Sequence, residues 1–202
     1  MGLSVVDGWK KGTQVSWEDP RYNHVSDAAL ARAARLGDRE AFEAIVHRHG
    51  PSLYRYARRM LADDGDVQEV VQDAFVGAWR DFDSYRGQSS LRTWLFGITA
   101  HKAIDRARKA RAKPIDDRVL QTKPAGPGSD PHIHLSQAEF LQALERALAE
   151  LPYRQRACWL LREVEGMSQV QIGRILGLSP GAVRGQLHRA RANLAGRMAS
   201  WQ

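Results

Sequence analysis

Apolar residues recur at helical spacing along most of this chain, beginning after residue 25. The clearest stripe follows an i, i+3, i+4 rule over about four turns, which indicates one face packed inward. No stretch alternates between apolar and polar residues as a half-buried strand would. The pattern predicts an all-α protein. The residues of the clearest stripe are Val67, Val70, Val71, Ala74, Phe75, Ala78, Trp79 and Phe82.

Capping residues mark the ends of the other helices expected before this stripe. Ser26 can cap a first helix that Gly37 ends. Asp38 can cap a second helix that ends at Gly50, and Pro51 suits the first position of a third. Together with the stripe, these signals predict four helices in succession.

A fifth helix and a change in composition follow. Ser90 can cap the fifth helix, which ends at Pro114. Residues 113–135 hold four prolines and two glycines and show no period, so they are expected to form a flexible linker. The fold class expected is therefore two small helical domains joined by a linker. The predicted divisions are a flexible arm over 1–25, a domain over 26–112, the linker over 113–135 and a domain over 136–202.

Two short amphipathic helices meet at a tight corner near the C-terminus. Ser168 and Gln171 form a capping box, and Gly177 can take the left-handed conformation that ends a helix. Ser179 can cap the next helix, with Pro180 in its first turn. The inward positions of that helix would be Val183, Leu187, Ala190 and Leu194. A helix-turn-helix results, and its outward residues are Arg184, Gly185, Gln186, His188, Arg189 and Arg191.

Composition narrows the class of protein. The chain has 202 residues, of which 43% are apolar and 26% charged, as in soluble globular proteins. Its single cysteine, Cys158, excludes an internal disulfide and a cysteine-cluster zinc site. No apolar run is long enough for a membrane span, and no signal-peptide core precedes the helices. We expect a cytoplasmic protein without membrane insertion.

The net charge of +7 is distributed unevenly. Residues 26–85 carry 8 basic and 11 acidic residues, whereas residues 86–113 carry 8 basic residues and Asp105 alone. From residue 168 onward there are 5 arginines and no acidic residue. Two basic zones indicate two contacts with a polyanion and leave an acidic surface for another partner. Arginine is the commonest side chain to read guanine in the major groove, which favours DNA.

Three segments resemble bacterial sigma factors of the extracytoplasmic-function (ECF) group, which is group 4 of the sigma-70 family. EVVQDAFVGAWRDFDSYRG resembles the helix of the family's second region and the turn after it, and SSLRTWLFGITAHKAIDRARK resembles the promoter-melting segment. LPYRQRACWLLREVEGMSQVQIGRILGLSPGAVRGQLHRARANL resembles the C-terminal domain. The likeness spans Ser26 to about Met198, and the segments stand in the family's order.

The resemblance implies an alternative sigma factor that binds core RNA polymerase and directs promoter recognition, −10 melting and initiation. Region 2 would take the polymerase and the −10 element, and region 4 the −35 element. The expected partners are the β′ clamp and β subunits, promoter DNA and an anti-sigma protein. Free of polymerase, the two domains could close on each other or on that inhibitor. The acidic outer face of the fourth helix suits a protein partner, and its expected polymerase contacts are Asp66, Glu69, Gln72 and Asp73.

The two DNA surfaces follow from the basic zones and the likeness together. Cations hold phosphates and aromatic walls accept unstacked bases, and the expected −10 residues are Arg86, Phe96, His101, Lys102, Asp105, Arg106 and Arg108. Carried over by position, the −35 residues are Arg162, Arg184, Gly185, His188 and Arg189, of which Arg162 would hold a phosphate. The chain departs from the family's common residues at Gly97, His101 and Gly185-Gln186, so the promoter sequence does not transfer.

Two other classes of protein are weighed against this interpretation. An enzyme would need a nucleophile, a phosphate loop or a metal site with three or more converging ligands. The pairs His47/His49 and His132/His134 do not supply three converging metal ligands. No catalytic residue, metal site or cofactor is therefore expected. A helix-turn-helix regulator that acts without polymerase is the other alternative. It has no need for a second basic, aromatic-bearing element at residues 86–113.

Overall fold

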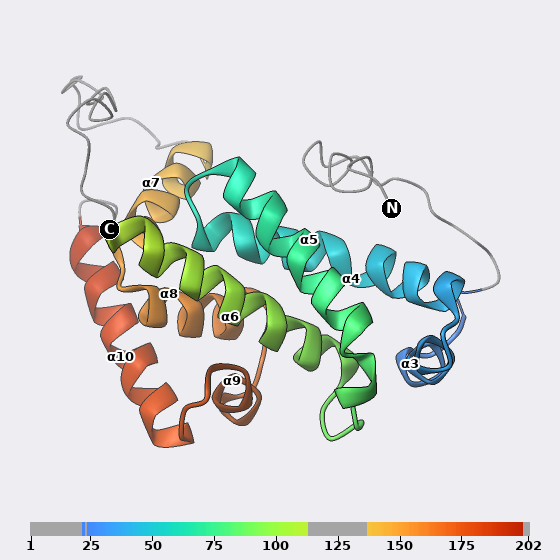
Figure 1. The fold of residues 1–202 in the computed structure, drawn as a ribbon. Coiled ribbons are helices and arrows are strands. Elements are labelled where there is room, and N and C mark those ends of the chain that lie inside the picture. The colour runs from blue at the N-terminus through green and yellow to red at the C-terminus, as the bar shows by residue number, and fades with distance from the viewer. Residues whose placement is uncertain (1–21, 23, 113–136, 200–202) are drawn as a thin grey trace.

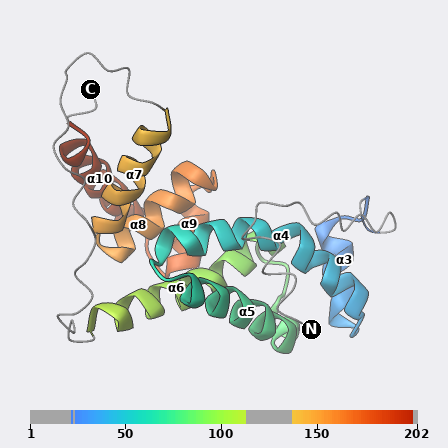
Figure 2. The same cartoon turned by 90° about the horizontal axis from the view of Figure 1, so that it is seen from above.

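The computed structural model describes residue 22 and residues 24–112 and 137–199, and every regular element among them is helical (Figures 1 and 2). This confirms the all-α class. The predicted linker and nearly all of the predicted N-terminal arm lie outside the described residues. The described residues fall into an N-terminal half, 22–112, and a C-terminal half, 137–199.

Side-chain caps start three helices of the N-terminal half. Ser26 accepts from the Ala29 amide, and Asp38 accepts from the Ala41 amide, as predicted. Asp63 caps the helix that carries the clear apolar stripe, and all but one of the stripe residues are buried. The elements of this half are α3 (Asp27–Arg35), α4 (Arg39–Met60), α5 (Asp64–Arg80), η1 (Phe82–Ser84) and α6 (Leu91–Ala112).

Helix α4 is one element, and the prediction of two helices that meet at Gly50-Pro51 was wrong. Proline has no amide hydrogen, so one hydrogen bond of the helix is missing at Pro51. Ile45 and Leu53, on either side of the proline, are both fully buried in the same core. Their burial along one continuous face outweighs the single lost hydrogen bond.

Helix α6 is the last helix of the N-terminal half, and it lies between the other helices of that half and the C-terminal half (Figures 1 and 2). It packs against α4 and α5 on one side and against α8 and α9 on the other. Its N-terminus is fixed by the Ser90 hydroxyl, which accepts from the Thr93 amide at 3.1 Å, as predicted. Because both sides are covered, its buried residues encircle much of the helix and include Thr93 and Thr99 as well as Leu95.

The C-terminal half contains a widened turn that sequence patterns did not predict. Its elements are α7 (Gln137–Glu150), α8 (Tyr153–Trp159), the π-helical turn η2 (Leu160–Val164), α9 (Gln169–Leu176) and α10 (Pro180–Arg197). The Glu165 amide donates to the Leu160 carbonyl at 3.1 Å, which closes the wide turn. Cys158 and Leu161 are buried as expected, but Val164 is exposed because it lies in the wide turn, which shifts the helical register.

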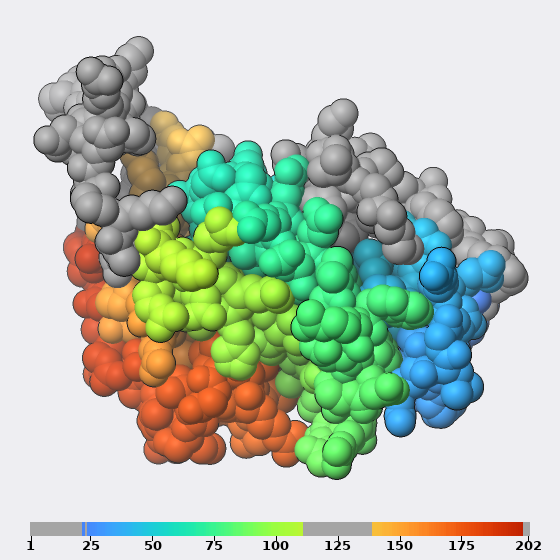
Figure 3. Space-filling view, viewed as in Figure 1, coloured from blue at the N-terminus to red at the C-terminus, as the bar shows by residue number. Residues whose placement is uncertain are grey.

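One hydrophobic core runs through both halves. Tyr56 on α4 and Cys158 on α8 are both fully buried, and burial raises the pKa of both side chains, that of Cys158 to about 11. The space-filling view shows the surface of the C-terminal half meeting that of α6 (Figure 3). We call this contact between the halves the seam.

Candidate nucleic-acid interface

The helix-turn-helix corner forms as predicted. Both hydrogen bonds of the capping box are present between Ser168 and Gln171, and Gly177 has a left-handed φ of 63°. The Leu178 amide donates to the Gly173 carbonyl at 2.9 Å. A Cβ atom on Gly173 would lie 2.6 Å from the Leu178 carbonyl oxygen, so glycine permits the close approach of the turn to α9.

Helix α10 separates its residues into an inner and an outer face. Val183, Leu187, Ala190 and Leu194 are buried, as the register predicts. The outer face exposes Arg184, His188 and Arg189, and the Arg189 guanidinium lies over Gly185. Within the described residues, Arg184 and Arg189 make no ion pair, so their charge is available to a ligand. These features are those of a major-groove reading helix.

The other arginines near α10 have protein partners. Arg191 Nη2 lies 2.6 Å from Glu163 Oε1, and Arg197 Nε lies 2.7 Å from Glu150 Oε2. Arg162 is exposed, and its Nη1 donates to the Met167 carbonyl at 3.0 Å. Arg162 is therefore held beside the start of the helix-turn-helix with part of its guanidinium still open to solvent.

The acidic residues of α5 lie against the basic residues of α6. Arg106 Nη1 lies 3.0 Å from Asp66 Oδ1, and the same guanidinium contacts Glu69. Lys102 Nζ lies 3.7 Å from Asp73 Oδ2. The hydrogen bond that Arg106 donates to Glu69 raises the pKa of Arg106, aided by the nearby charge of Asp66. Three of the four residues predicted to contact polymerase are thus paired with two of the residues predicted to contact DNA.

The remaining predicted residues of this half differ in accessibility. Gln72, His101 and Arg86 are exposed, and Arg108 pairs with Asp105 at 3.0 Å on its own helix. Asp66 is the most covered member of the predicted polymerase surface, whereas Glu69, Gln72 and Asp73 remain open to solvent.

The prediction that Phe96 contacts DNA is wrong for this arrangement. Its side chain is 0% exposed and packs edge-on against Tyr56, with ring centroids 5.6 Å apart. The Arg92 guanidinium covers the ring at 4.9 Å from its centroid. Phe96 therefore belongs to the core, because α6 has a second packed face that the apolar pattern did not separate from an open one.

Sequence reasoning missed the polar contacts across the seam. Arg92 Nη2 lies 2.5 Å from Glu165 Oε2, and Arg174 Nη1 donates to the Gln88 carbonyl at 3.2 Å. Gln171 Nε2 donates to Thr93 Oγ1 at 3.4 Å. These partners are 73 to 86 positions apart in the chain, so no local spacing could reveal them.

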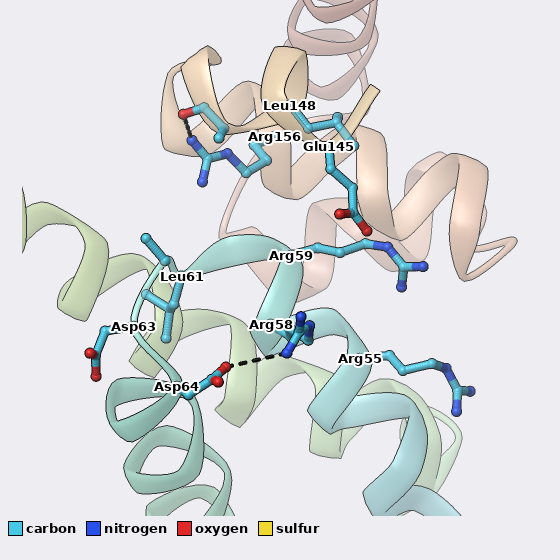
Figure 4. Close-up of a pocket in the computed structure, with 11 residues that line it drawn as sticks. Arg55, Arg58, Arg59, Leu61, Asp63, Asp64, Glu145, Leu148 and Arg156 are labelled. Carbon is cyan, nitrogen blue, oxygen red and sulfur yellow. Dashed lines mark hydrogen bonds and ion pairs between the residues drawn. The ribbon is translucent and has the colours of Figure 1, made fainter. Parts of the chain in front are cut away.

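A pocket of about 670 Å³ lies at another part of the seam, between the end of α4 and α7 (Figure 4). Arg156 Nη1 donates to the Met60 carbonyl at 3.0 Å and so ties α8 to the end of α4. Arg58 pairs with Asp64 at 3.3 Å. The lining also includes Arg55, Arg59, Leu61, Asp63, Glu145 and Leu148.

Within residues 22, 24–112 and 137–199, no cluster of three or more histidine, cysteine, aspartate or glutamate side chains could hold a metal ion. Over the same residues, no helix has both the length and the apolar character needed to cross a membrane.

Comparison with known proteins gives consistent matches over both halves. A family model for sigma-70 region 2 matches residues 45–113, and one for sigma-70 region 4 matches residues 141–194. The RNA polymerase sigma factor NccH of Alcaligenes xylosoxydans xylosoxydans is 36% identical, over 87% of this chain and 96% of that protein. The ECF RNA polymerase sigma factor SigM of Mycobacterium tuberculosis (strain ATCC 25618 / H37Rv) is 35% identical, over 84% of this chain and 83% of that protein.

Solved structures have the same fold. The structure of CnrH in complex with the cytosolic domain of CnrY matches with a TM-score of 0.65 and 32% identity, over 86% of this chain and 97% of that chain. The sigma factor RpoE, in complex with the anti-sigma factor NepR from Bartonella quintana, matches with a TM-score of 0.61 at 24% identity, which supports the fold alone.

Proposed function

This chain belongs to the ECF sigma factors of the sigma-70 family, and we propose that its two halves divide promoter recognition between them. It is an alternative sigma factor, which binds core RNA polymerase and directs transcription initiation. The division that we propose assigns residues 26–112 to the polymerase and the −10 element and residues 136–202 to the −35 element. Residues 113–135 would connect the two.

The outer face of α10 is the observation that carries the −35 assignment. Arg184, His188 and Arg189 are exposed there while the opposite face is buried, so the helix can enter a major groove without losing its core contacts. Gly185 lies beneath the Arg189 guanidinium, where a Cβ atom would be 3.5 Å from Arg189 Nη1. Arg162 would add a phosphate contact from the preceding helix.

The proposed polymerase surface is the exposed part of α5. Glu69, Gln72 and Asp73 face solvent and would meet the β′ clamp, with Asp66 behind them. Acidic side chains repel a DNA backbone and suit a basic protein surface. The proposed −10 surface comprises Arg86, His101, Lys102, Asp105, Arg106 and Arg108, which form the basic rim of α6 and the loop before it.

We also propose an anti-sigma protein as a regulatory partner. The solved complex of CnrH holds the cytosolic domain of CnrY, and CnrH resembles this chain over nearly its whole length. The pocket at the seam suits such a partner because both halves line it. Arg55 and Arg59 make no ion pair within the described residues, so an acidic helix with one apolar edge would complement the pocket.

We place this activity in the cytoplasm and assign the chain no enzymatic reaction of its own. Sigma factors are initiation factors, and the polymerase supplies the chemistry. A sigma factor needs core polymerase to act, whereas a helix-turn-helix regulator of the alternative class does not, and this difference separates the two functions.

Run-off transcription with purified core polymerase tests the proposal directly. Genomic fragments serve as templates, and start-site mapping identifies the promoters. We expect specific transcripts only when this chain and core polymerase are both present. A protein that binds duplex DNA tightly alone and yields no transcript with core polymerase would instead be a regulator of the alternative class.

A further inference from the structure

The ion pair between Arg92 and Glu165 has an unusual environment at the seam. The Glu165 side chain is only 6% exposed, whereas that of Arg92 is 37% exposed. Besides the 2.5 Å contact between side chains, Arg92 Nη1 donates to the Glu165 carbonyl at 3.1 Å. A buried carboxylate needs a cation close by, so Glu165 depends on Arg92 in this arrangement.

Arg92 differs from the other paired cations of α6 in the source of its partner. Lys102 and Arg106 pair with carboxylates of α5, and Arg108 pairs with Asp105 on α6 itself. These contacts lie within the N-terminal half and persist whatever the position of the C-terminal half. Among the described ion-paired cations of α6, Arg92 alone takes its carboxylate from across the seam. The ion pair of Arg92 therefore exists only while the two halves are packed together.

The same part of the C-terminal half covers the surroundings of Arg92. Gln171 contacts Thr93, and Arg174 contacts the carbonyl of Gln88 in the loop before α6. Glu165, Gln171 and Arg174 belong to one stretch of ten positions, 165–174, which contains most of α9. α9 lies alongside α6 in the fold (Figure 1). Any ligand that reaches Arg92 from this side must displace α9.

We propose that Arg92 binds a backbone phosphate of single-stranded promoter DNA and that Glu165 occupies this site while the halves are packed together. The proposal rests on the function proposed above. A guanidinium binds carboxylate and phosphate through the same paired donors, so Glu165 acts as an internal substitute for phosphate. The open, DNA-bound form and the packed form therefore compete for one cation.

The Arg92–Glu165 ion pair adds little to the cost of separating the halves, which also share a hydrophobic core. A buried ion pair contributes little net stability, because desolvation of both charges offsets their attraction. When the halves separate, both groups regain water, and Arg92 can then exchange Glu165 for phosphate. Removing Arg92 alone has a different effect, because it leaves a buried carboxylate without a cation.

The test uses the full-length chain and a mixed-sequence single-stranded DNA oligonucleotide, with binding followed by fluorescence anisotropy at several salt concentrations. We expect Glu165→Gln to increase the affinity about fivefold or more, the lower end of typical coupling between two sites. Glu163→Gln is the matched control, because Glu163 is two residues away and pairs with Arg191 inside the C-terminal half. An equal gain in both variants would show a general charge effect and overturn the proposal.

The double variant Arg92→Gln/Glu165→Gln identifies the cation. It removes both charges, so it avoids the unpaired buried carboxylate that can unfold Arg92→Gln. We expect the double variant to lose the gain of Glu165→Gln and to reduce the slope of log affinity against log salt by about one. If the gain persists without Arg92, the phosphate site lies elsewhere.

Transcription with core polymerase separates this proposal from the function on which it rests. A chain that yields no specific transcript contradicts the proposed function, whatever the anisotropy shows. Normal transcription, together with identical oligonucleotide binding by Glu165→Gln and the unaltered chain, contradicts only the role of Glu165.

Discussion

Helices α6 and α10 both contribute to the positive charge of this sigma factor, but the fold treats their cations in opposite ways. On α10, Arg184 and Arg189 face solvent and make no ion pair within the described residues. On α6, Lys102 and Arg106 are paired with carboxylates of α5, and Arg92 is paired across the seam. The outer face of α10 thus keeps free charge, whereas the cations of α6 that face α5 or the seam are neutralised.

The difference between α6 and α10 shows that a count of charges along the sequence does not predict which charges stay free in the fold. Such a count compares a residue only with its neighbours in the sequence, whereas the carboxylates that neutralise α6 lie 29 to 73 positions away. On α10 itself, Arg191 and Arg197 are also paired with distant glutamates. The outer face of α10 keeps its free arginines because none of the elements that the structure describes covers Arg184 or Arg189.

The largest effect is expected at Arg189. Arg189→Ala should weaken binding of holoenzyme to −35 duplex DNA by about 1–3 kcal/mol and relax preference at one base, because a base-reading guanidinium is lost. Electrophoretic mobility assays with promoter variants measure both changes. Arg197→Ala is the matched control, since Arg197 is already paired with Glu150. Unaltered promoter selection by Arg189→Ala would show that a different face of α10 reads the DNA.

A smaller effect is expected on folding when a paired cation of α6 is removed. Arg106→Ala should lower the free energy of unfolding by about 0.5–1 kcal/mol, because Asp66 and Glu69 lose their shared partner in a partly solvated site. Chemical denaturation followed by circular dichroism measures the change. Arg184→Ala should leave the stability unaltered. Equal stability of the two variants would remove the contrast between the helices.

The smallest effect is expected on mild acidification. Burial lowers the pKa of His47 and His49 below the ordinary 6.5, although Asp27, 3.2 Å from His49, opposes this. The unfolded chain then binds more protons than the folded chain, so the free energy of unfolding should fall as the pH decreases below about 6.5. His49→Gln should reduce this slope in denaturation curves, whereas His188→Gln, on the exposed face of α10, should not. An identical slope for both variants would contradict the role of burial.

Features encoded by neighbouring residues could be predicted from the sequence. The caps Ser26, Asp38 and Ser90 and the corner at Gly177 rest on contacts within a few positions, and each forms as expected. The register of α10 follows for the same reason, since one buried face determines it. The family assignment used these segments and is confirmed by the comparisons.

Features that depend on packing could not be predicted. Helix α4 continues through Pro51 because the residues before and after the proline pack into the same core. A proline in the sequence suggests a helix end and gives no information on that packing. Phe96 is buried because α6 is covered on two sides. The spacing of apolar residues does not show which of two apolar faces packs against another helix and which would stay open.

The wide turn at Leu160–Val164 sets the direction of everything after it. A π-turn accommodates about one more residue than an ordinary helical turn, and each residue corresponds to about 100° of rotation. Deleting a single position there would swing Glu165 away from Arg92 without changing the charge or the chemistry of any group that remains. The coupling that we propose between the two halves therefore depends on the length of the chain at one point, and a mutation that alters no functional side chain would uncouple them.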